Sequence, residues 1–259
     1  MSEELLIQRE GGVVTFALSR PKAANALSIS LLHALQQELE KYQYDQTIRA
    51  LVLRGEGDKV FCAGADLKER KRMSETEVKK TVSLIRETVD KLERFPKPVI
   101  AAMNGSALGG GLEVALACDI RVASIEGKYG LPETSLAIIP GAGGTQRLAR
   151  LIGLGKAKEL IFTAKQVDGE TAKAIGLAEY AEPTSEVIKK AREIAEEIEN
   201  NGPIALESAK KAINLGYETA LATGLMIEQQ AYAATIQTKD RLEGLQAFAE
   251  KRQPLYEGK

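Results

Sequence analysis

Short apolar runs recur along the first half of the chain and predict strands. Residues 5–10 and 13–18 flank a Gly-Gly pair, a pattern typical of a hairpin. Three further runs lie at residues 48–53, 99–103 and 120–123. Each is shorter than a typical helix and follows or precedes a Gly, Pro or polar residue, which favours a buried strand.

Amphipathic stretches lie between and after these runs and predict helices. The first stripe follows Ser28 or Ser30, either of which can cap a helix, and consists of Leu32, Leu35, Leu39 and Tyr42. Ser74 and Glu77 have the spacing of a capping box and precede a second stripe, which Pro96 ends. Further helices are predicted at residues 112–118, 145–151, 187–198, 204–215, 219–235 and 240–251.

Strands and helices alternate in the first part of the chain, whereas only helices follow in the last part. This order indicates an α/β protein with parallel β/α units and an α-helical extension. Residues 61–70 and the Gly-rich residues 105–111 are expected to be turns. A length of 259 residues fits one large domain or one domain with an appendage.

Composition excludes several kinds of chemistry. With 35 Lys and Arg against 36 Asp and Glu, the chain has no overall basic field for nucleic acid or an anionic membrane. One His and two Cys cannot build a multi-His metal site or a four-Cys zinc site. His33 lies off its helical stripe and is expected at the surface, and Cys62 and Cys118 are expected to be buried, reduced thiols. The N-terminus lacks the apolar core of a signal peptide, so a cytoplasmic protein is expected.

The most informative segment is the Gly-rich stretch NGSALGGGLE at residues 104–113. Three consecutive glycines between a strand and a helix let the backbone approach a ligand closely, and free N–H groups there can bind an oxyanion. Glu113 follows in an otherwise apolar helix, where it is either a surface residue or a buried functional acid. Neither a P-loop nor a G-x-G-x-x-G motif occurs in the sequence.

Two other segments carry candidate groups. Glu133 follows Pro132 ahead of an apolar run, so its carboxyl group is either a solvated turn residue or a second functional acid. Residues 61–68, FCAGADLK, contain small residues that leave the backbone accessible. In that segment Asp66 can cap the next helix and Lys68 can reach an anion.

Together with residues 19–28, these segments resemble the enoyl-CoA hydratase/isomerase (crotonase) superfamily. The resemblance is carried, in family order along the whole chain, by RPKAANA (20–26), FCAGAD (61–66), ALGGGLE (107–113), CD (118–119) and IPGAGGTQ (139–146). Longer strings such as ALACDIRVA and LAIIPGAGGTQRL look most like the 3-methylglutaconyl-CoA hydratase subgroup, which includes an AU-rich-RNA-binding member.

The resemblance implies a spiral of ββα units followed by a helical C-terminal region used in trimerisation, in trimers or dimers of trimers. We therefore expect an active-site core in residues 1–195 and an oligomerisation region in residues 196–259. In the family two backbone N–H groups hold the thioester oxygen, and they match Ala65 and Gly110 here. Such donors stabilise the enolate-like charge that develops on that oxygen.

Hydratases of the family use two glutamates, which match Glu113 and Glu133. We expect Glu113 to activate water and Glu133 to donate the proton, which makes the protein a hydro-lyase. An enoyl-CoA isomerase stays an alternative, although many isomerases of the superfamily lack one of the two glutamates. The pathway also stays open between fatty-acid metabolism and leucine breakdown. No metal or redox cofactor is implied, because coenzyme A is part of the substrate.

The resemblance also implies contacts with coenzyme A and the acyl group. The candidate contacts are Arg20, Lys22, Ala24, Ala63, Asp66, Leu67, Lys68, Gly109, Phe248 and Lys251, the last reached from a neighbouring subunit. If the substrate carries a carboxylate, Lys68, Lys71 and Arg72 are candidate partners. The helix after the first loop has one Lys, at its end, and acids at Glu38 and Glu40, so RNA binding is not expected to carry over.

Overall fold

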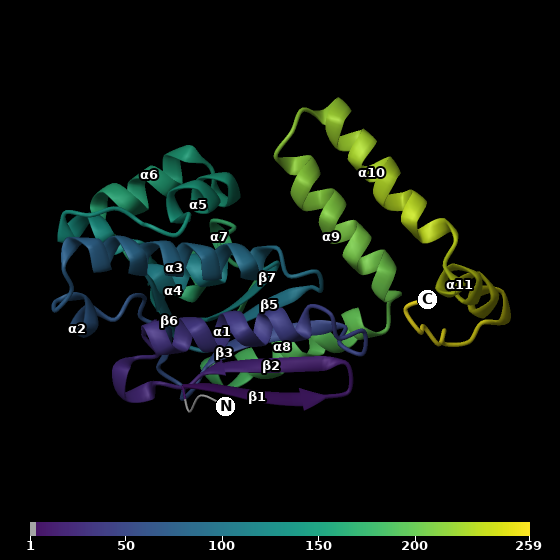
Figure 1. The fold of residues 1–259 in the computed structure, drawn as a ribbon, viewed down its shortest axis with the longest axis horizontal. Coiled ribbons are helices and arrows are strands. Elements are labelled where there is room, and N and C mark those ends of the chain that lie inside the picture. Colours follow the sequence, from purple (N-terminus) through teal and green to yellow (C-terminus); the bar gives the residue numbers. More distant parts are fainter. Residues whose placement is uncertain (1–3) are drawn as a thin grey trace.

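The computed structural model describes residues 4–259 and has a core of sheets and helices from which a helical arm extends (Figure 1). The strands are β1 (Leu5–Glu10), β2 (Val13–Leu18), β3 (Ala50–Gly55), β4 (Val60–Cys62), β5 (Val99–Met103), β6 (Ser106–Leu108), β7 (Ile120–Ser124), β8 (Tyr129–Gly130) and β9 (Tyr180–Glu182). The core helices are α1 (Ile29–Tyr42), α2 (Leu67–Arg70), α3 (Glu75–Glu93), α4 (Gly110–Leu116), α5 (Gly144–Ile152), α6 (Leu154–Thr163), α7 (Gly169–Ala174) and α8 (Thr184–Glu199). Two 3₁₀ helices are η1 (Pro21–Ala23) and η2 (Pro132–Leu136), and the arm consists of α9 (Pro203–Tyr217), α10 (Leu221–Ile236) and α11 (Lys239–Glu250).

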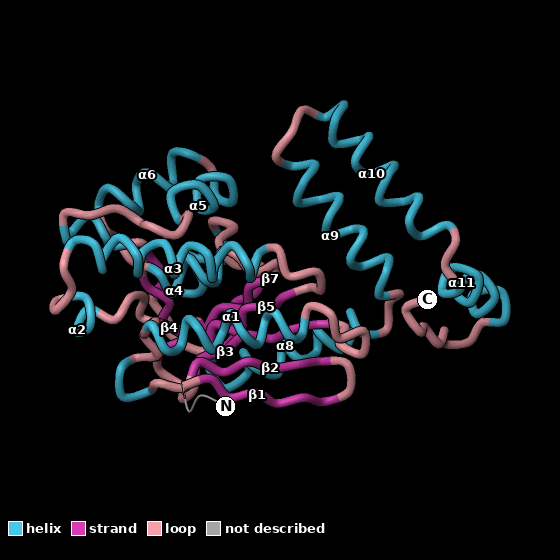
Figure 2. Tube along the Cα trace, in the orientation of Figure 1, coloured by secondary structure: helices cyan, strands magenta, loops and turns pink. Residues whose placement is uncertain are grey.

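The larger sheet has the strand order β1-β2-β3-β5-β7-β9. Figure 2 shows β1, β2 and β3 of this sheet in magenta, side by side. The β1–β2 hairpin is antiparallel, and all the remaining strand pairs of this sheet are parallel. Parallel strands are joined by helices that cross over the sheet, and helices cover both faces of the parallel part. A smaller parallel sheet consists of three short strands in the order β4-β6-β8. The strand β6 ends directly before the three consecutive glycines at residues 109–111.

The side chains of the central strands point alternately to the two faces of the larger sheet, and each face has its own hydrophobic core. In β5, Val99, Ala101 and Met103 pack with α1, α3 and α4 on one face. Ile100 and Ala102 point to the other face, where they meet α8. Because side chains alternate along a strand, a strand that is apolar at every position must be covered on both faces.

Local sequence signals account for the ends of the long core helices. Ser28 caps α1 by accepting a hydrogen bond from the N–H of Leu31 at 3.0 Å. Ser74 and Glu77 form the expected capping box at the start of α3. The prediction of strands and helices in alternation, followed by helices alone, is confirmed. His33 is exposed, and the Cys62 and Cys118 thiols are free and buried, as expected.

Three details of the sequence prediction differ from the structure. Residues 61–70 are not a simple turn but contain the end of β4 and all of α2, and the Gly-rich turn expected at residues 105–111 contains β6. The helix expected at residues 112–118 begins at Gly110 and ends at Leu116. The expected border between residues 195 and 196 falls inside α8, and the division into two regions stays a prediction.

A buried ion pair attaches the arm to the core. Lys210 of α9 donates to a carboxylate oxygen of Asp119 at 2.7 Å and to the carbonyl oxygen of Lys97 at 3.1 Å. The same oxygen of Asp119 accepts from the N–H of Val99 at 2.7 Å. The Lys210 side chain is 9% exposed and that of Asp119 is 25% exposed, so the pair is shielded from solvent.

Replacing Lys210 with Met should destabilise the protein, because the Asp119 carboxylate would lose its counter-ion while staying largely buried. We expect a loss of about 2–3 kcal/mol in the free energy of unfolding, measured by urea denaturation. The matched control is Lys211→Met, since Lys211 is exposed. Equal stability of the two variants would contradict the structural role of the ion pair.

Candidate active site

The end of β4 and the start of α4 approach each other so closely that two backbone amides lie side by side. Gly64 has φ +91°, and a Cβ atom on it would lie 2.9 Å from the nitrogen of Gly110. A Cβ atom on Gly110 would in turn lie 3.5 Å from the nitrogen of Ala65. The approach therefore requires a residue without a side chain at position 64, where φ is also unfavourable for other residues.

These two amides have no acceptor in the described part of the chain. Neither the N–H of Ala65 nor that of Gly110 donates a hydrogen bond within residues 4–259. Two unsatisfied N–H groups at one place are suited to bind an oxygen that carries or develops negative charge. The structure thus brings together the two residues that the sequence predicted as an oxyanion site.

Glu113 lies in the first turn of α4 with its side chain turned into the protein, and it is 3% exposed. Its Oε1 atom accepts hydrogen bonds from the N–H groups of Ala142 and Gly144, both at 2.8 Å. A Cβ atom on Gly144 would lie 2.9 Å from that oxygen, so the loop can reach the carboxylate only with glycine there. The second oxygen, Oε2, has no hydrogen-bond partner within residues 4–259.

The pKa of Glu113 is raised overall above its ordinary value, as the result of two opposing effects. Burial raises the pKa, because the charged form loses hydration. The N–H groups of Gly144 and Ala142 and the positive charges of Arg147 and Arg86 lower it. The carboxyl group is therefore desolvated but keeps groups that stabilise its anionic form.

Arg147 fixes the loop that holds Glu113, and sequence reasoning missed it. Its Nη1 atom donates to the carbonyl oxygen of Ala142 at 2.8 Å, and its Nε and Nη2 atoms form a bidentate pair with Glu93 at 2.9 and 2.7 Å. Asp90 adds a further ion pair at 2.8 Å. The signal in the sequence is a basic residue three positions after a glycine-rich loop, which becomes informative only once α3 is known to lie beside it.

Glu133 lies in η2 in a different electrostatic environment. Its Oε2 atom is buried without a hydrogen-bond partner among the described residues. Burial, and to a smaller extent the charge of Glu113, raises the pKa of Glu133 to about 7. A Cβ atom on Gly109 would lie 3.1 Å from Oε1, which places this carboxyl group beside the start of α4.

A pocket opens beside the Ala65 amide. Its walls come from the loop before α1, from α2 with the loop that follows it, and from α3. The residues that line it are Leu27, Ala65, Asp66, Glu69, Arg70, Met73, Val78, Thr81, Val82 and Ile85. Most of the wall is apolar, so it offers a surface along which a short carbon chain can pack, although the enclosed volume of about 10 Å³ is only that of one water molecule.

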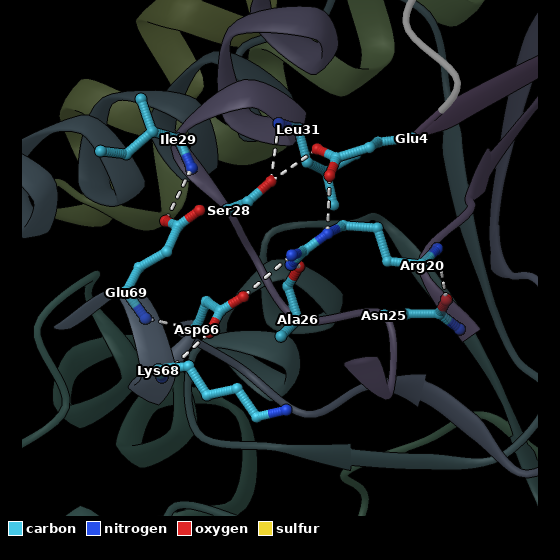
Figure 3. Close-up of polar contacts among 10 residues, drawn as sticks. All are labelled: Glu4, Arg20, Asn25, Ala26, Ser28, Ile29, Leu31, Asp66, Lys68 and Glu69. Atoms are coloured by element: carbon cyan, nitrogen blue, oxygen red, sulfur yellow. Dashed lines mark hydrogen bonds and ion pairs between the residues drawn. The ribbon is translucent and has the colours of Figure 1, made fainter. Parts of the chain in front are cut away.

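Two of the predicted binding residues belong to a structural ion cluster (Figure 3). Arg20 pairs with Asp66 at 2.9 Å and with Glu4 at 2.8 Å, and it donates to the carbonyl oxygen of Ala26 at 2.6 Å. The other oxygen of Asp66 caps α2 by accepting from the N–H groups of Lys68 and Glu69 at 3.0 and 3.3 Å. The Asp66 carboxylate thus holds α2 against the first loop.

The other predicted contacts divide into two groups. Lys22, Lys68 and Leu67 are exposed, and the N–H of Ala63 donates to the carbonyl oxygen of Ala24 at 3.1 Å. The exposed residues Phe248 and Lys251 lie on α11 and just after it, in the arm, on the opposite side of Figure 1 from α2. Within one chain, the structure does not bring these two residues to the pocket.

Neither a metal cluster nor a membrane-spanning helix occurs in the part of the chain that the structure describes. Among residues 4–259, no group of three or more His, Cys, Asp or Glu side chains is placed to hold a metal ion. No helix within that range combines the length and the apolar character needed to span a bilayer.

Known proteins share both the sequence and this geometry. The family model for enoyl-CoA hydratase/isomerase matches residues 8–259. The chain belongs to the enoyl-CoA hydratase/isomerase family. The resemblance inferred from the glycine-rich segments and the two glutamates is thereby confirmed at the level of the family and its crotonase fold.

Individual relatives within the enoyl-CoA hydratase/isomerase family are similar over nearly the whole chain. A Bacillus subtilis protein named as an enoyl-CoA hydratase/isomerase, YngF, is 58% identical over 93% of both chains. Mouse mitochondrial methylglutaconyl-CoA hydratase is 51% identical over 98% of this chain and 82% of its own. The crystal structure of enoyl-CoA hydratase from Bacillus anthracis is 52% identical, with a TM-score of 0.98 over 99% of this chain and 100% of that chain.

The raised pKa of Glu133 predicts how the stability of a Glu133 variant depends on pH. A carboxyl group whose pKa is raised on folding stabilises the protein fully below its unfolded pKa, and this contribution is lost as pH rises through the folded pKa. Glu133→Gln keeps the shape but cannot ionise, so it should melt a few degrees above the wild type at about pH 8 and much closer to it at about pH 5. Thermal unfolding at the two pH values tests this, with exposed Glu170→Gln as control. A difference that does not depend on pH would contradict the raised pKa.

Proposed function

We propose that the protein is an enoyl-CoA hydratase, which adds water in a syn sense across the trans-2 double bond of a short-chain enoyl-CoA thioester. One observation carries the proposal: two desolvated carboxyl groups, of which only Glu113 accepts backbone hydrogen bonds from a neighbouring loop, lie beside a pair of free backbone amides. Addition of water to a conjugated thioester needs a base, an acid and a group that stabilises charge on the thioester oxygen.

In this proposal the thioester oxygen binds to the N–H groups of Ala65 and Gly110. Attack of water at Cβ moves electron density onto that oxygen, and both N–H groups then make stronger hydrogen bonds to it than in the ground state. Each donor of this kind is worth about 100- to 1,000-fold in rate. The acyl chain beyond the thioester lies along the apolar pocket that begins at Ala65.

The two glutamates divide the proton transfers. Oε1 of Glu113 accepts from the N–H groups of Ala142 and Gly144, which stabilises the anion, and Oε2 is left to take a proton from the attacking water. Glu133 has a pKa near neutrality and a buried oxygen without a partner, which suits it to carry the proton for Cα. The backbone donors of the loop at Glu113, and their absence at Glu133, thus favour Glu113 as the base and Glu133 as the acid.

The presence of both groups favours hydration over double-bond isomerisation. Isomerisation moves one proton between two carbons, and a single acid–base group suffices for that, whereas hydration involves a proton from water and a proton to Cα. The alternative activity is an enoyl-CoA isomerase, and the family description includes both reactions.

Replacing either glutamate with Gln should abolish hydration, because each variant lacks one proton transfer. We expect kcat for crotonyl-CoA to fall by at least about 1,000-fold. The assay measures hydration as the loss of the conjugated-thioester absorbance. The variant Glu170→Gln, at an exposed site, should retain wild-type activity, and circular dichroism checks that the catalytic variants are folded.

A second substrate separates the two candidate activities. A 3-enoyl-CoA assayed beside crotonyl-CoA measures isomerisation directly. Faster turnover of the 3-enoyl substrate than of crotonyl-CoA would support the isomerase instead. Near-normal hydration by either glutamate variant would overturn the two-carboxylate mechanism.

The physiological substrate is proposed to lie among short acyl groups, with 3-methylglutaconyl-CoA in leucine breakdown as one candidate. The support is the 51% identity to a protein named methylglutaconyl-CoA hydratase, which spans nearly the whole chain. Short-chain fatty-acid metabolism is the other proposed setting, because the name of the Bacillus relative specifies the reaction type but no acyl group.

The arm is proposed to assemble the chain into a trimer or a dimer of trimers. It leaves many large apolar side chains exposed, among them Ile213, Tyr217, Leu221, Leu225, Met226, Tyr232, Leu242, Leu245 and Phe248. An apolar surface of this kind marks a site of association, since soluble monomers rarely expose apolar side chains contiguously. A neighbouring copy could then supply Phe248 and Lys251 to the pocket, which their own chain does not.

The assembly is tested by the molar mass in solution. Sedimentation equilibrium should give three or six times the 28.0 kDa of one chain. Leu225→Asp in the arm should lower the mass to that of one chain by placing a charge in the apolar contact, while the exposed site Glu228→Asp serves as control. A wild-type protein that sediments as a single chain would contradict the proposal.

A further inference from the structure

One positively charged side chain, Arg70, lies in the wall of the otherwise mainly apolar pocket. It is the last residue of α2 and is half-buried. Its guanidinium group forms no ion pair and no side-chain hydrogen bond within residues 4–259. Arginines that are partly withdrawn from water usually have a carboxylate or carbonyl partner, so an unpaired one beside a binding pocket points to a ligand.

The acidic residues of the same wall are already engaged. Asp66 pairs with Arg20 and caps α2, and Glu69 accepts a hydrogen bond from the N–H of Ile29 at 3.3 Å. These contacts direct the Asp66 carboxylate toward the first loop and the Glu69 carboxylate toward the start of α1, as Figure 3 shows. Arg70 is therefore the charged group of the wall that stays available to a ligand.

The short separation between Arg70 and the free amide of Ala65 indicates the length of acyl group that could reach both residues. The two residues are separated by the single turn of α2, which rises about 1.5 Å per residue. An acyl group whose thioester oxygen is held at Ala65 extends past Met73 and Val82 along this wall. A carboxylate on the far end of a short acyl group falls within reach of the long Arg70 side chain.

We propose that Arg70 determines specificity by binding a carboxylate at the far end of a short acyl group. The inference rests on the proposed function and narrows its substrates to enoyl-CoA thioesters of dicarboxylic acids. The guanidinium group can bind a carboxylate through two parallel hydrogen bonds. A purely alkyl acyl group would instead leave the charge of Arg70 without a partner and partly stripped of water.

The neighbouring cations do not occupy an equivalent position. Lys68, Lys71 and Arg72 were the candidates suggested by the sequence, but all three are exposed and none lines the pocket. The short helix turns Arg70 toward the wall formed by α3 and turns its neighbours to solvent. The structure therefore replaces three candidates by a fourth that the sequence alone did not distinguish.

Two substrates of equal length test the proposal. Glutaconyl-CoA and trans-2-pentenoyl-CoA both have five acyl carbons, and only the first ends in a carboxylate. For the wild type, kcat/KM should be higher for glutaconyl-CoA. Arg70→Met should lower kcat/KM for glutaconyl-CoA by about 10- to 100-fold through KM, and should leave that for pentenoyl-CoA unchanged or raised.

Three variants serve as controls. Lys71→Met and Arg72→Met remove a neighbouring positive charge that does not line the pocket, and they should preserve the preference for glutaconyl-CoA. Arg70→Lys keeps the charge without the bidentate geometry and should restore part of the preference. Equal losses on both substrates in Arg70→Met would show a structural role and overturn the proposal.

The outcomes also separate this inference from the proposed function. A wild type that hydrates both substrates without preferring glutaconyl-CoA overturns the role of Arg70 and leaves the hydratase intact. A wild type that hydrates neither these substrates nor crotonyl-CoA overturns the hydratase itself. A preference that survives in Arg70→Met but disappears in Lys71→Met or Arg72→Met assigns the carboxylate to the neighbouring cation and contradicts the proposal.

Discussion

The contact between the backbone of β4 and the first turn of α4 is the constraint on which the site depends. A Cβ atom on Gly111 would lie 2.0 Å from the carbonyl oxygen of Cys62, so a side chain there would push the two segments apart. Their close approach places the amides of Ala65 and Gly110 side by side and starts the pocket at Ala65. It also sets the direction of α4, which turns Glu113 into the protein rather than toward solvent.

The chemical difference between the two glutamates comes from their neighbours. Burial raises the pKa of both carboxyl groups, but the loop at residues 142–144 offers N–H donors only to Glu113. Arg147 keeps that loop in place by joining its carbonyl group to two acids of α3. This ion cluster thus acts on Glu113 in two ways, through the backbone of the loop that it holds and through the positive charge of Arg147.

Sequence reasoning succeeded where a signal was local. The Ser28 cap, the capping box at Ser74 and the apolar strands depend on residues close together in the chain, and their positions were predicted closely. The strands β4, β6 and β8 have only two or three residues, too few to show a period, so the smaller sheet was missed. Family motifs located the amides and glutamates, whereas the roles of Arg147 and Arg70 depend on which helices pack beside them.

The short helix α4 also separates two parts of the molecule by a fixed number of residues. Glu113 lies in its first turn, and Asp119, to which the arm is attached through Lys210, comes three residues after its end. Each residue added to or removed from a helix rotates the next segment of the chain by about 100° and shifts it by about 1.5 Å. An insertion or deletion in this segment would therefore displace the arm relative to the catalytic centre even if every side chain were kept.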